Sequence, residues 1–187
     1  MHPNSQISIF QELALIPPDP IFNLTDSYKA DSFPQKINVG VGAYRLNDGK
    51  PYVLKVVRKA EQIILNGNED HEYLPIAGLP AFRKHSLRLA VGSEADNFAV
   101  VQCISGTGSL RVGAEFIKSA FPNSSIYISN PTWSNHRSIF EAANLKVEEY
   151  RYYDPITRGL AFEAYKQDVL NAPNGSVFVL HACAHNP

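Results

Sequence analysis

The chain has 187 residues, of which 44% are hydrophobic and 19% charged, a balance typical of a globular domain rather than of a disordered or low-complexity segment. A formal net charge of −1 gives no sign of a nucleic-acid-binding surface, and the apolar runs are too short to span a bilayer. Two cysteines, Cys103 and Cys183, with no CxxC spacing, exclude a disulfide scaffold and favour a reducing compartment.

The two ends of the sequence lead to two expectations. Residues 1–19 contain no Arg or Lys, so they match neither a signal peptide nor an Arg-rich transit peptide, and the expected location is cytoplasmic. The chain stops at Pro187, directly after the apolar run 176–180, whereas domains usually end in a polar tail or a docked helix. We therefore expect a truncated chain.

The first fifty residues are rich in turn formers. Residues 16–20 read Ile-Pro-Pro-Asp-Pro and predict an extended arm, because proline is excluded from helix interiors. Residues 36–41 have the pattern of a strand, and the sequence Asn-Asp-Gly at 47–49 predicts a turn.

The next segment is helical. Apolar residues between Val53 and Ile64 recur at a spacing of 3.6, and Asn66-Gly67 predict the end of that helix. Residues 79–90 predict a second helix, with a proline in its first turn and a glycine after its end.

After residue 97 strands and helices alternate. The pattern predicts an α/β fold with a largely parallel sheet. The predicted strands are 98–104, 126–128, 147–153 and 177–181, and the predicted helices are 110–121, 136–143 and 162–170.

The sequence Ser105-Gly106-Thr107-Gly108 lies between a predicted buried strand and a helix. Glycines allow a ligand close to the backbone, and the free N–H groups of a helix start favour an anion such as phosphate. The loop is neither a P-loop, since no lysine follows, nor a GxGxxG motif. The alternative is a plain turn in which Ser105 or Thr107 caps the helix.

Trp133, the only tryptophan, lies in the segment Asn130–His136 that follows a predicted strand. Ligands of α/β proteins bind outside the carboxyl ends of strands, and an indole there can stack on a flat cofactor ring. The alternative is a core tryptophan beneath a loop.

The last residues hold a possible metal-binding spacing. His181, Cys183 and His185 share one face of an extended strand, but no fourth ligand has a convincing spacing. The alternative is a buried strand with small residues, after which Asn186 presents an amide to a ligand. Near the other end, Gly40 and Gly42 offer either backbone N–H groups to an anion or a strand bulge.

Five segments, taken together in their order and spacing, resemble the aspartate aminotransferase family, which is class I, pyridoxal 5'-phosphate dependent and of fold type I. The resemblance runs from about Pro17 to Pro187 and covers only the N-terminal half of such an enzyme. The five segments are Val-Gly-Val-Gly-Ala-Tyr-Arg (39–45), Glu-Tyr-Leu-Pro-Ile-Ala-Gly-Leu-Pro (72–80), Ser-Gly-Thr-Gly-Ser-Leu-Arg (105–111), Asn-Pro-Thr-Trp-Ser-Asn-His (130–136) and His-Ala-Cys-Ala-His-Asn-Pro (181–187).

The resemblance implies part of fold type I, a mostly parallel sheet with flanking helices, truncated after about four sheet strands. It implies an N-terminal arm and small-domain segment over residues 1–48, and half of the large cofactor-binding domain over 49–187. Of the four strands, only 126–128 and 147–153 are expected to be neighbours. Absent strands are expected to separate 177–181 from 126–128 and from 98–104.

The resemblance also implies roles for residues around the cofactor, pyridoxal 5'-phosphate. They are Ser105, Gly106 and Thr107 on the phosphate, Trp133 on the pyridine ring, Asn186 on the phenolic oxygen, and His136 behind the acidic residue that pairs with the pyridine nitrogen.

Further implied roles concern the substrate and a second subunit. Gly42 matches the glycine whose backbone meets the substrate's α-carboxylate, beside Trp133 and Asn186. Tyr73 matches a tyrosine that reaches the phosphate of the neighbouring subunit, so a homodimer is implied. The arm around residues 9–19 resembles the segment that embraces that subunit.

No catalytic residue is assigned within the chain. The Schiff-base lysine, the aspartate at the pyridine nitrogen and the substrate-binding arginines of the family belong beyond Pro187, and none of the nine lysines has a matching context. Two functions remain open. One is transamination of L-aspartate with 2-oxoglutarate, acting on small dicarboxylic amino and keto acids; the other is a non-catalytic remnant that binds phosphate ligands or a full-length partner. Beside this resemblance, the hypothesis of a metal site at His181, Cys183 and His185 is disfavoured.

Overall fold

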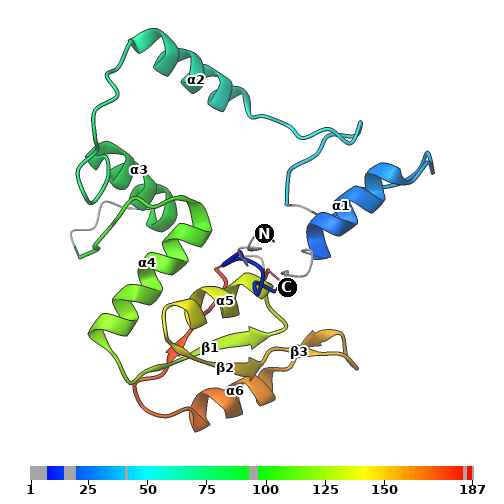
Figure 1. Ribbon diagram of the computed structural model, residues 1–187, viewed down its shortest axis with the longest axis vertical. Helices are drawn as coiled ribbons and strands as arrows, with labels where there is room; N and C mark the ends of the chain where they lie inside the picture. The colour runs from blue at the N-terminus through cyan, green and yellow to red at the C-terminus, as the bar shows by residue number, and fades with distance from the viewer. Residues whose placement is uncertain (1–7, 15–19, 41, 93–96, 183–184, 187) are drawn as a thin grey trace, which may run out of the picture. The chain divides into compact units, whose positions relative to one another are not determined.

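The computed structural model describes residues 8–14, 20–40, 42–92, 97–182 and 185–186 (Figure 1). By its internal contacts the chain divides into two units, residues 1–71 and 72–187. The domain boundary expected after residue 48 stays a prediction.

The described residues of the first unit form two helices, α1 (Pro20–Ala30) and α2 (Lys55–Gly67). The expected extended arm over 16–20 is wrong at Pro20, which begins α1; residues 16–19 lie outside the described residues. Proline is excluded from helix interiors but suits the first position, where its missing N–H costs nothing. Helix α2 confirms the predicted helix, and it ends at Gly67 because Asn68 adopts a left-handed conformation with φ of 50°.

The segment between these helices is held by turns rather than by a sheet. Residues 36–40 pair with no strand among the described residues, so the expected strand is wrong there, and Val41 lies outside them. The Lys36 ammonium instead donates to the carbonyls of Tyr28 and Asp31, at 2.6 Å each. The predicted turn at 47–49 is confirmed: the Gly49 N–H donates to the Leu46 carbonyl (2.9 Å).

The second unit confirms the predicted α/β class. Three parallel strands form a sheet in the order β2-β1-β5, and two short strands form a separate antiparallel pair. The helices are α3 (Pro80–Val91), α4 (Ser105–Ala120), α5 (Ser134–Ala142) and α6 (Phe162–Asn171), and the strands are β1 (Ser125–Asn130), β2 (Lys146–Arg151), β3 (Tyr153–Asp154), β4 (Gly159–Leu160) and β5 (Val177–Phe178).

One face of the sheet carries the apolar core. Ile126 and Ile128 alternate along β1 and are each 1% exposed, because side chains two residues apart point to the same face. They pack with Ala114 of α4 and Phe140 of α5, so these two helices cover this face. Partly buried aliphatic residues complete the cluster, among them Val147 and Val177, which lie opposite Ile126 in the parallel register.

The opposite face is aromatic and packs against α6. Tyr127 stacks on Phe178 with ring centroids 4.9 Å apart, and Tyr150 meets Tyr165 of α6 at 5.4 Å. The Tyr150 hydroxyl donates to the Val179 carbonyl (2.8 Å), and burial raises the pKa of this phenol. Buried on both faces, β1 is the central strand.

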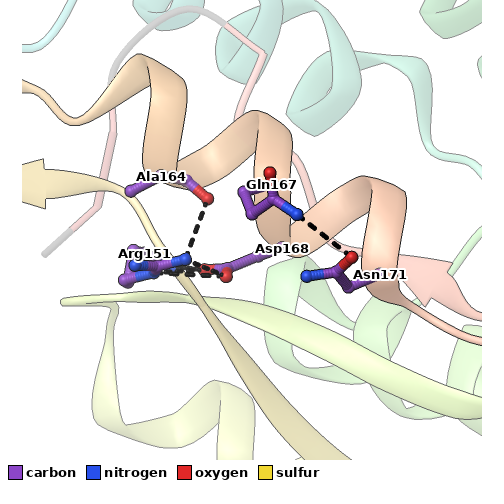
Figure 2. A network of polar contacts seen from close by, with 5 residues as sticks. All are labelled: Arg151, Ala164, Gln167, Asp168 and Asn171. Atoms are coloured by element: carbon purple, nitrogen blue, oxygen red, sulfur yellow. Dashed lines mark hydrogen bonds and ion pairs between the residues drawn. The ribbon is translucent and has the colours of Figure 1, made fainter.

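A charged contact fixes α6 to the end of β2 (Figure 2). The Arg151 guanidinium binds both carboxylate oxygens of Asp168, and the Arg151 backbone N–H donates to the same carboxylate at 2.8 Å. The bonds to Arg151 hold the pKa of Asp168 below its usual value. Because the guanidinium is largely exposed, this ion pair contributes orientation more than stability.

The structure corrects two expectations about the sheet. The predicted strand 98–104 forms no strand; its extended backbone bonds to residues 77–83, with the Gln102 N–H donating to the Ala77 carbonyl (3.0 Å) and Arg83 to the Val100 carbonyl (3.1 Å). The expected strand between 126–128 and 177–181 is also wrong. Strand β5 pairs directly with β1, with Val177 beside Ile126, and the ladder covers only Val177 and Phe178.

Candidate functional site

The first turn of α4 presents backbone N–H groups without a side-chain cap. The N-cap residue is Ile104, whose side chain cannot accept a hydrogen bond, and the Gly108 N–H is bonded to the Ile104 carbonyl (3.0 Å). The N–H groups of Gly106 and Thr107 therefore precede the first hydrogen bond of the helix and have no acceptor within it. Ser105 and Thr107 are exposed and neither side chain caps the helix, so the alternative of a plain capped turn is wrong.

Space is open beside Gly106. A Cβ placed on this residue would meet no atom within 4 Å, so the backbone can be approached closely by a ligand. The dipole of this 16-residue helix adds partial positive charge at the same end. The turn therefore has the chemistry of an anion site.

The second part of the site follows β1, where the chain turns into α5. Trp133 is half-buried, and its indole meets the ring of His136 edge-on, with centroids 5.3 Å apart and planes at 89°. His136 is only 7% exposed and shares a hydrogen bond between its Nδ1 and the Thr132 hydroxyl (2.8 Å). The turn thus holds a partly open indole on a buried imidazole.

The third part comes from residues 181–186 and joins the second directly. The backbone N–H of Trp133 donates to the backbone carbonyl of Asn186 (3.0 Å), and the backbone N–H of Asn186 donates to His181 Nδ1 (2.8 Å). Asn186 is exposed, which leaves its side-chain amide accessible. Two segments far apart in the sequence therefore meet at the carboxyl end of the sheet, where α/β proteins bind ligands.

Five rings form a continuous chain of contacts across this junction. His185 stacks between Tyr152 and His181, with centroid distances of 4.1 and 4.2 Å and interplanar angles of 12° and 9°. His181 in turn meets His136 at 5.2 Å, and His136 meets Trp133.

Two histidines of this cluster, His136 and His181, favour the neutral form more than a free imidazole does. Burial is the main cause that lowers the pKa of His136 and of His181, and neighbouring imidazoles lower both further. Since His181 Nδ1 accepts the Asn186 N–H, its proton is on Nε2, and this buried nitrogen has no partner in the described residues. An unpaired buried donor is available to an additional group at the site.

The structure brings together only some of the predicted site residues. Trp133, His136 and Asn186 form one cluster, while Ser105, Gly106 and Thr107 form the start of α4 in the same unit. Tyr73 is 98% exposed and contacts neither group through a ring or hydrogen bond in the described residues. Gly42 lies in the first unit, and a Cβ there would meet no atom within 4 Å.

Sequence reasoning missed three residues of the cluster: Thr132, Tyr152 and Ser129, whose hydroxyl lies 3.3 Å from His185 Nε2. No local spacing marks Ser129 and Tyr152, because their partner His185 is distant in sequence, whereas Thr132 lies only four residues before its partner His136. His181 and His185 were noticed for metal binding. Within the described ranges no three His, Cys, Asp or Glu side chains are grouped to hold a metal ion, and Cys183 lies outside those ranges.

Among the described helices, none has the length and apolar character needed to cross a membrane.

Comparison with known proteins gives one consistent result. Residues 34–187 match the family model described as aminotransferase class I and II. The chain is 50% identical to the cytoplasmic aspartate aminotransferase of Oryza sativa subsp. japonica, over 96% of this chain and 46% of that protein. It is 47% identical to the mitochondrial aspartate aminotransferase of Schizosaccharomyces pombe, over 96% of this chain and 42% of that protein.

A solved structure agrees with these relatives. An aromatic-amino-acid aminotransferase from Burkholderia pseudomallei, covalently bound to pyridoxal phosphate, superposes with a TM-score of 0.89 at 37% identity, over 97% of this chain and 47% of that chain. The expected fold class, part of the α/β fold of these enzymes, is confirmed. The chain spans less than half the length of the curated relatives it matches.

Proposed function

The chain belongs to the class I and II aminotransferase family, and we propose that the protein carrying it transfers the amino group of L-aspartate to 2-oxoglutarate, giving oxaloacetate and L-glutamate. The proposed cofactor is pyridoxal 5'-phosphate. When bound, it supplies the electron-withdrawing ring that lets the α-carbon of the amino acid lose its proton.

The first turn of α4 is the proposed phosphate site. The N–H groups of Gly106 and Thr107 and the hydroxyls of Ser105 and Thr107 donate to phosphate oxygens, and the helix dipole favours the negative charge. The uncapped helix start and the open space beside Gly106 support this role.

The junction of Trp133 and Asn186 is the proposed ring site. The indole would pack on the flat face of the cofactor ring, the Asn186 amide would donate to its phenolic oxygen, and buried His136 would support the acidic residue that pairs with the pyridine nitrogen. The hydrogen bond from the backbone N–H of Trp133 to the backbone carbonyl of Asn186 is the main support for this proposal, because it brings the two residues together at one end of the sheet.

Two further proposals concern the substrate and the assembly. The Gly42 backbone N–H is proposed to bind the α-carboxylate of the substrate. Tyr73 is proposed to reach the phosphate of a second copy in a homodimer, with the arm around residues 9–19 embracing that copy. The 98% exposure of Tyr73 supports a role directed away from its own unit.

A coupled assay tests the activity. The complete gene product, supplied with pyridoxal phosphate, aspartate and 2-oxoglutarate, is expected to form oxaloacetate, which malate dehydrogenase reduces with loss of NADH absorbance. The 187-residue polypeptide alone is expected to give no turnover, because none of its nine lysines has the sequence context of the family's lysine that links to the cofactor and carries the proton. Turnover by a verified 187-residue chain would contradict this second expectation.

The alternative function is a non-catalytic chain that binds phosphate ligands or a full-length partner. We retain this alternative because the chain matches less than half of each of these relatives. Sequencing the transcript beyond the codon for Pro187 separates the two functions, because the transaminase requires further coding sequence. The cytoplasm is the proposed location, and imaging of the tagged complete gene product tests it against the mitochondrion.

A further inference from the structure

We propose that His185 is a positioning residue of the ring site: it fixes the turn at 129–133 against residues 181–186 and so sets the distance between Trp133 and Asn186. The expected effect on cofactor binding rests on the proposed function, but the contact of His185 with the turn at 129–133 is independent of any ligand. The sequence assigns His185 no role in the cofactor site. The only ligand that its spacing from His181 and Cys183 suggested was a metal ion.

The need for a second contact follows from the geometry of the junction. Trp133 and Asn186 belong to segments more than fifty residues apart, and one backbone hydrogen bond of 3.0 Å joins them directly. The pairing of β1 with β5 and the contact of His136 with His181 already align the two segments. Between the turn at 129–133 and residues 185–186, a second hydrogen bond beside this one fixes their distance more closely.

His185 supplies that second bond. Its Nε2 lies 2.9 Å from the Pro131 carbonyl oxygen and 3.3 Å from the hydroxyl of Ser129, which is 1% exposed. A carbonyl can only accept, so Nε2 carries the proton and donates to Pro131. The bond therefore runs from the residue before Asn186 to the turn that leads into Trp133.

The ring of His185 is fixed on both faces, which gives the bond its direction. Tyr152 covers one face, and the Tyr152 N–H donates to the Asn130 carbonyl (3.3 Å), so this tyrosine is anchored to the end of β1. His181 covers the other face and accepts the Asn186 N–H. The imidazole thus lies between His181 of its own segment and Tyr152, which follows β2.

Two substitutions separate the hydrogen bond from the stacking. In His185→Gln the side-chain amide nitrogen replaces Nε2 as a donor, whereas in His185→Phe the stacked ring is kept and the donor is lost. His85→Gln is the control, because His85 is an exposed histidine of α3 in the same unit. The complete gene product is used, and Trp133 emission is isolated by subtracting the spectrum of Trp133→Phe.

We expect His185→Phe to shift the Trp133 emission of the cofactor-free protein and to weaken pyridoxal phosphate binding about three- to tenfold, the effect of one neutral hydrogen bond. His185→Gln and His85→Gln are expected to match the wild type in both measurements. We also expect His185→Phe to lower kcat, with a smaller effect on the KM for aspartate, because the proposed α-carboxylate contact at the Gly42 backbone does not involve His185, whereas the contacts of Trp133 and Asn186 do.

Other results overturn the proposal. Wild-type emission and affinity in His185→Phe would show that the donor is not needed. An equal loss in both variants, in step with a lower melting temperature, would show that the ring only stabilises the fold. If the wild type binds no pyridoxal phosphate, the proposed function fails, while the emission of the cofactor-free variants still decides the role of His185.

Discussion

At the scale of single residues, the charge state of His136 and His181 links the site to pH. Burial, and then the neighbouring imidazoles, lowers the pKa of each ring below the ordinary 6.5. In the unfolded chain both rings titrate near 6.5, so just below that pH the unfolded state binds more protons than the folded state. The free energy of unfolding is therefore highest above about pH 6.5 and falls as the pH drops through the window down to the folded pKa values.

Proton NMR of the imidazole rings tests this directly. In the folded complete gene product we expect the resonances of His136 and His181 to titrate at lower pH than in the same protein unfolded in urea. Single His136→Asn and His181→Asn variants assign the two resonances. If both titrate at the same pH in the folded and unfolded states, the lowered pKa values are wrong.

Gly106 offers a test of the phosphate site. We expect Gly106→Leu to weaken binding of pyridoxal phosphate by about tenfold or more, because a side chain would occupy the space through which the phosphate reaches the backbone donors. Gly113→Leu is the matched control: it lies in the same helix, and a Cβ there also meets no atom within 4 Å. Absorbance titration measures both. Equal affinity in the two variants would place phosphate binding elsewhere, for example on surface lysines.

At the scale of elements, the extended segment 98–104 depends on Gly78. This glycine has φ of 89°, and a Cβ on it would lie 2.1 Å from the Gln102 Cβ. Gln102 in turn accepts the Leu79 N–H on its side-chain oxygen (2.8 Å). We expect Gly78→Ala to cost about 2–4 kcal/mol, because positive-φ strain and a steric clash add together.

Gly92→Ala is the control for that prediction. Gly92 also has a positive φ, of 76°, but a Cβ there meets no atom within 4 Å, so only the backbone strain of about 1 kcal/mol applies. Urea unfolding of both variants of the complete gene product measures the difference. Equal losses would show that the contact between Gly78 and Gln102 does not form.

The elements also show where sequence reasoning works. Helix α2 follows from apolar residues at a spacing of 3.6 and from the end signal at Asn66-Gly67, and the predicted helix 162–170 agrees with α6 to within one residue. The pairing of β5 with β1, and the absence of a partner strand for residues 98–104 among the described residues, depend on segments far away in the chain. Periodicity identifies an extended segment but not its neighbour, which is why the expected strand order was wrong.

The same limit applies to the candidate site. The motif around Trp133 and the uncapped turn at Ser105 are local, and their chemistry can be read from residue types. The bond from His185 to the Pro131 carbonyl joins segments that only the fold brings together. For this reason the sequence left His185 between a metal ligand and a residue of a buried strand, whereas the structure shows a hydrogen-bond donor.

At the scale of the whole molecule, the chain leaves too much apolar surface uncovered. Its accessible surface is 15,915 Å². A folded monomer of this mass exposes about 9,000 Å², and two separately folded units of these lengths would together expose about 11,000 Å². Apolar side chains contribute to this surface: α2 has no buried residue, and its Ile63, Ile64 and Leu65 are each more than 60% exposed.

This surface predicts how the 187-residue polypeptide behaves when it is made alone. Exposed aliphatic helix faces and the unpaired outer edge of β5 favour association, so we expect the polypeptide to aggregate or to unfold without a sharp transition. Light scattering, binding of an apolar fluorescent dye and urea unfolding measure these properties, with the complete gene product as the control. A soluble monomer that unfolds in one sharp transition, and binds no dye, would show that the uncovered surface does not govern folding.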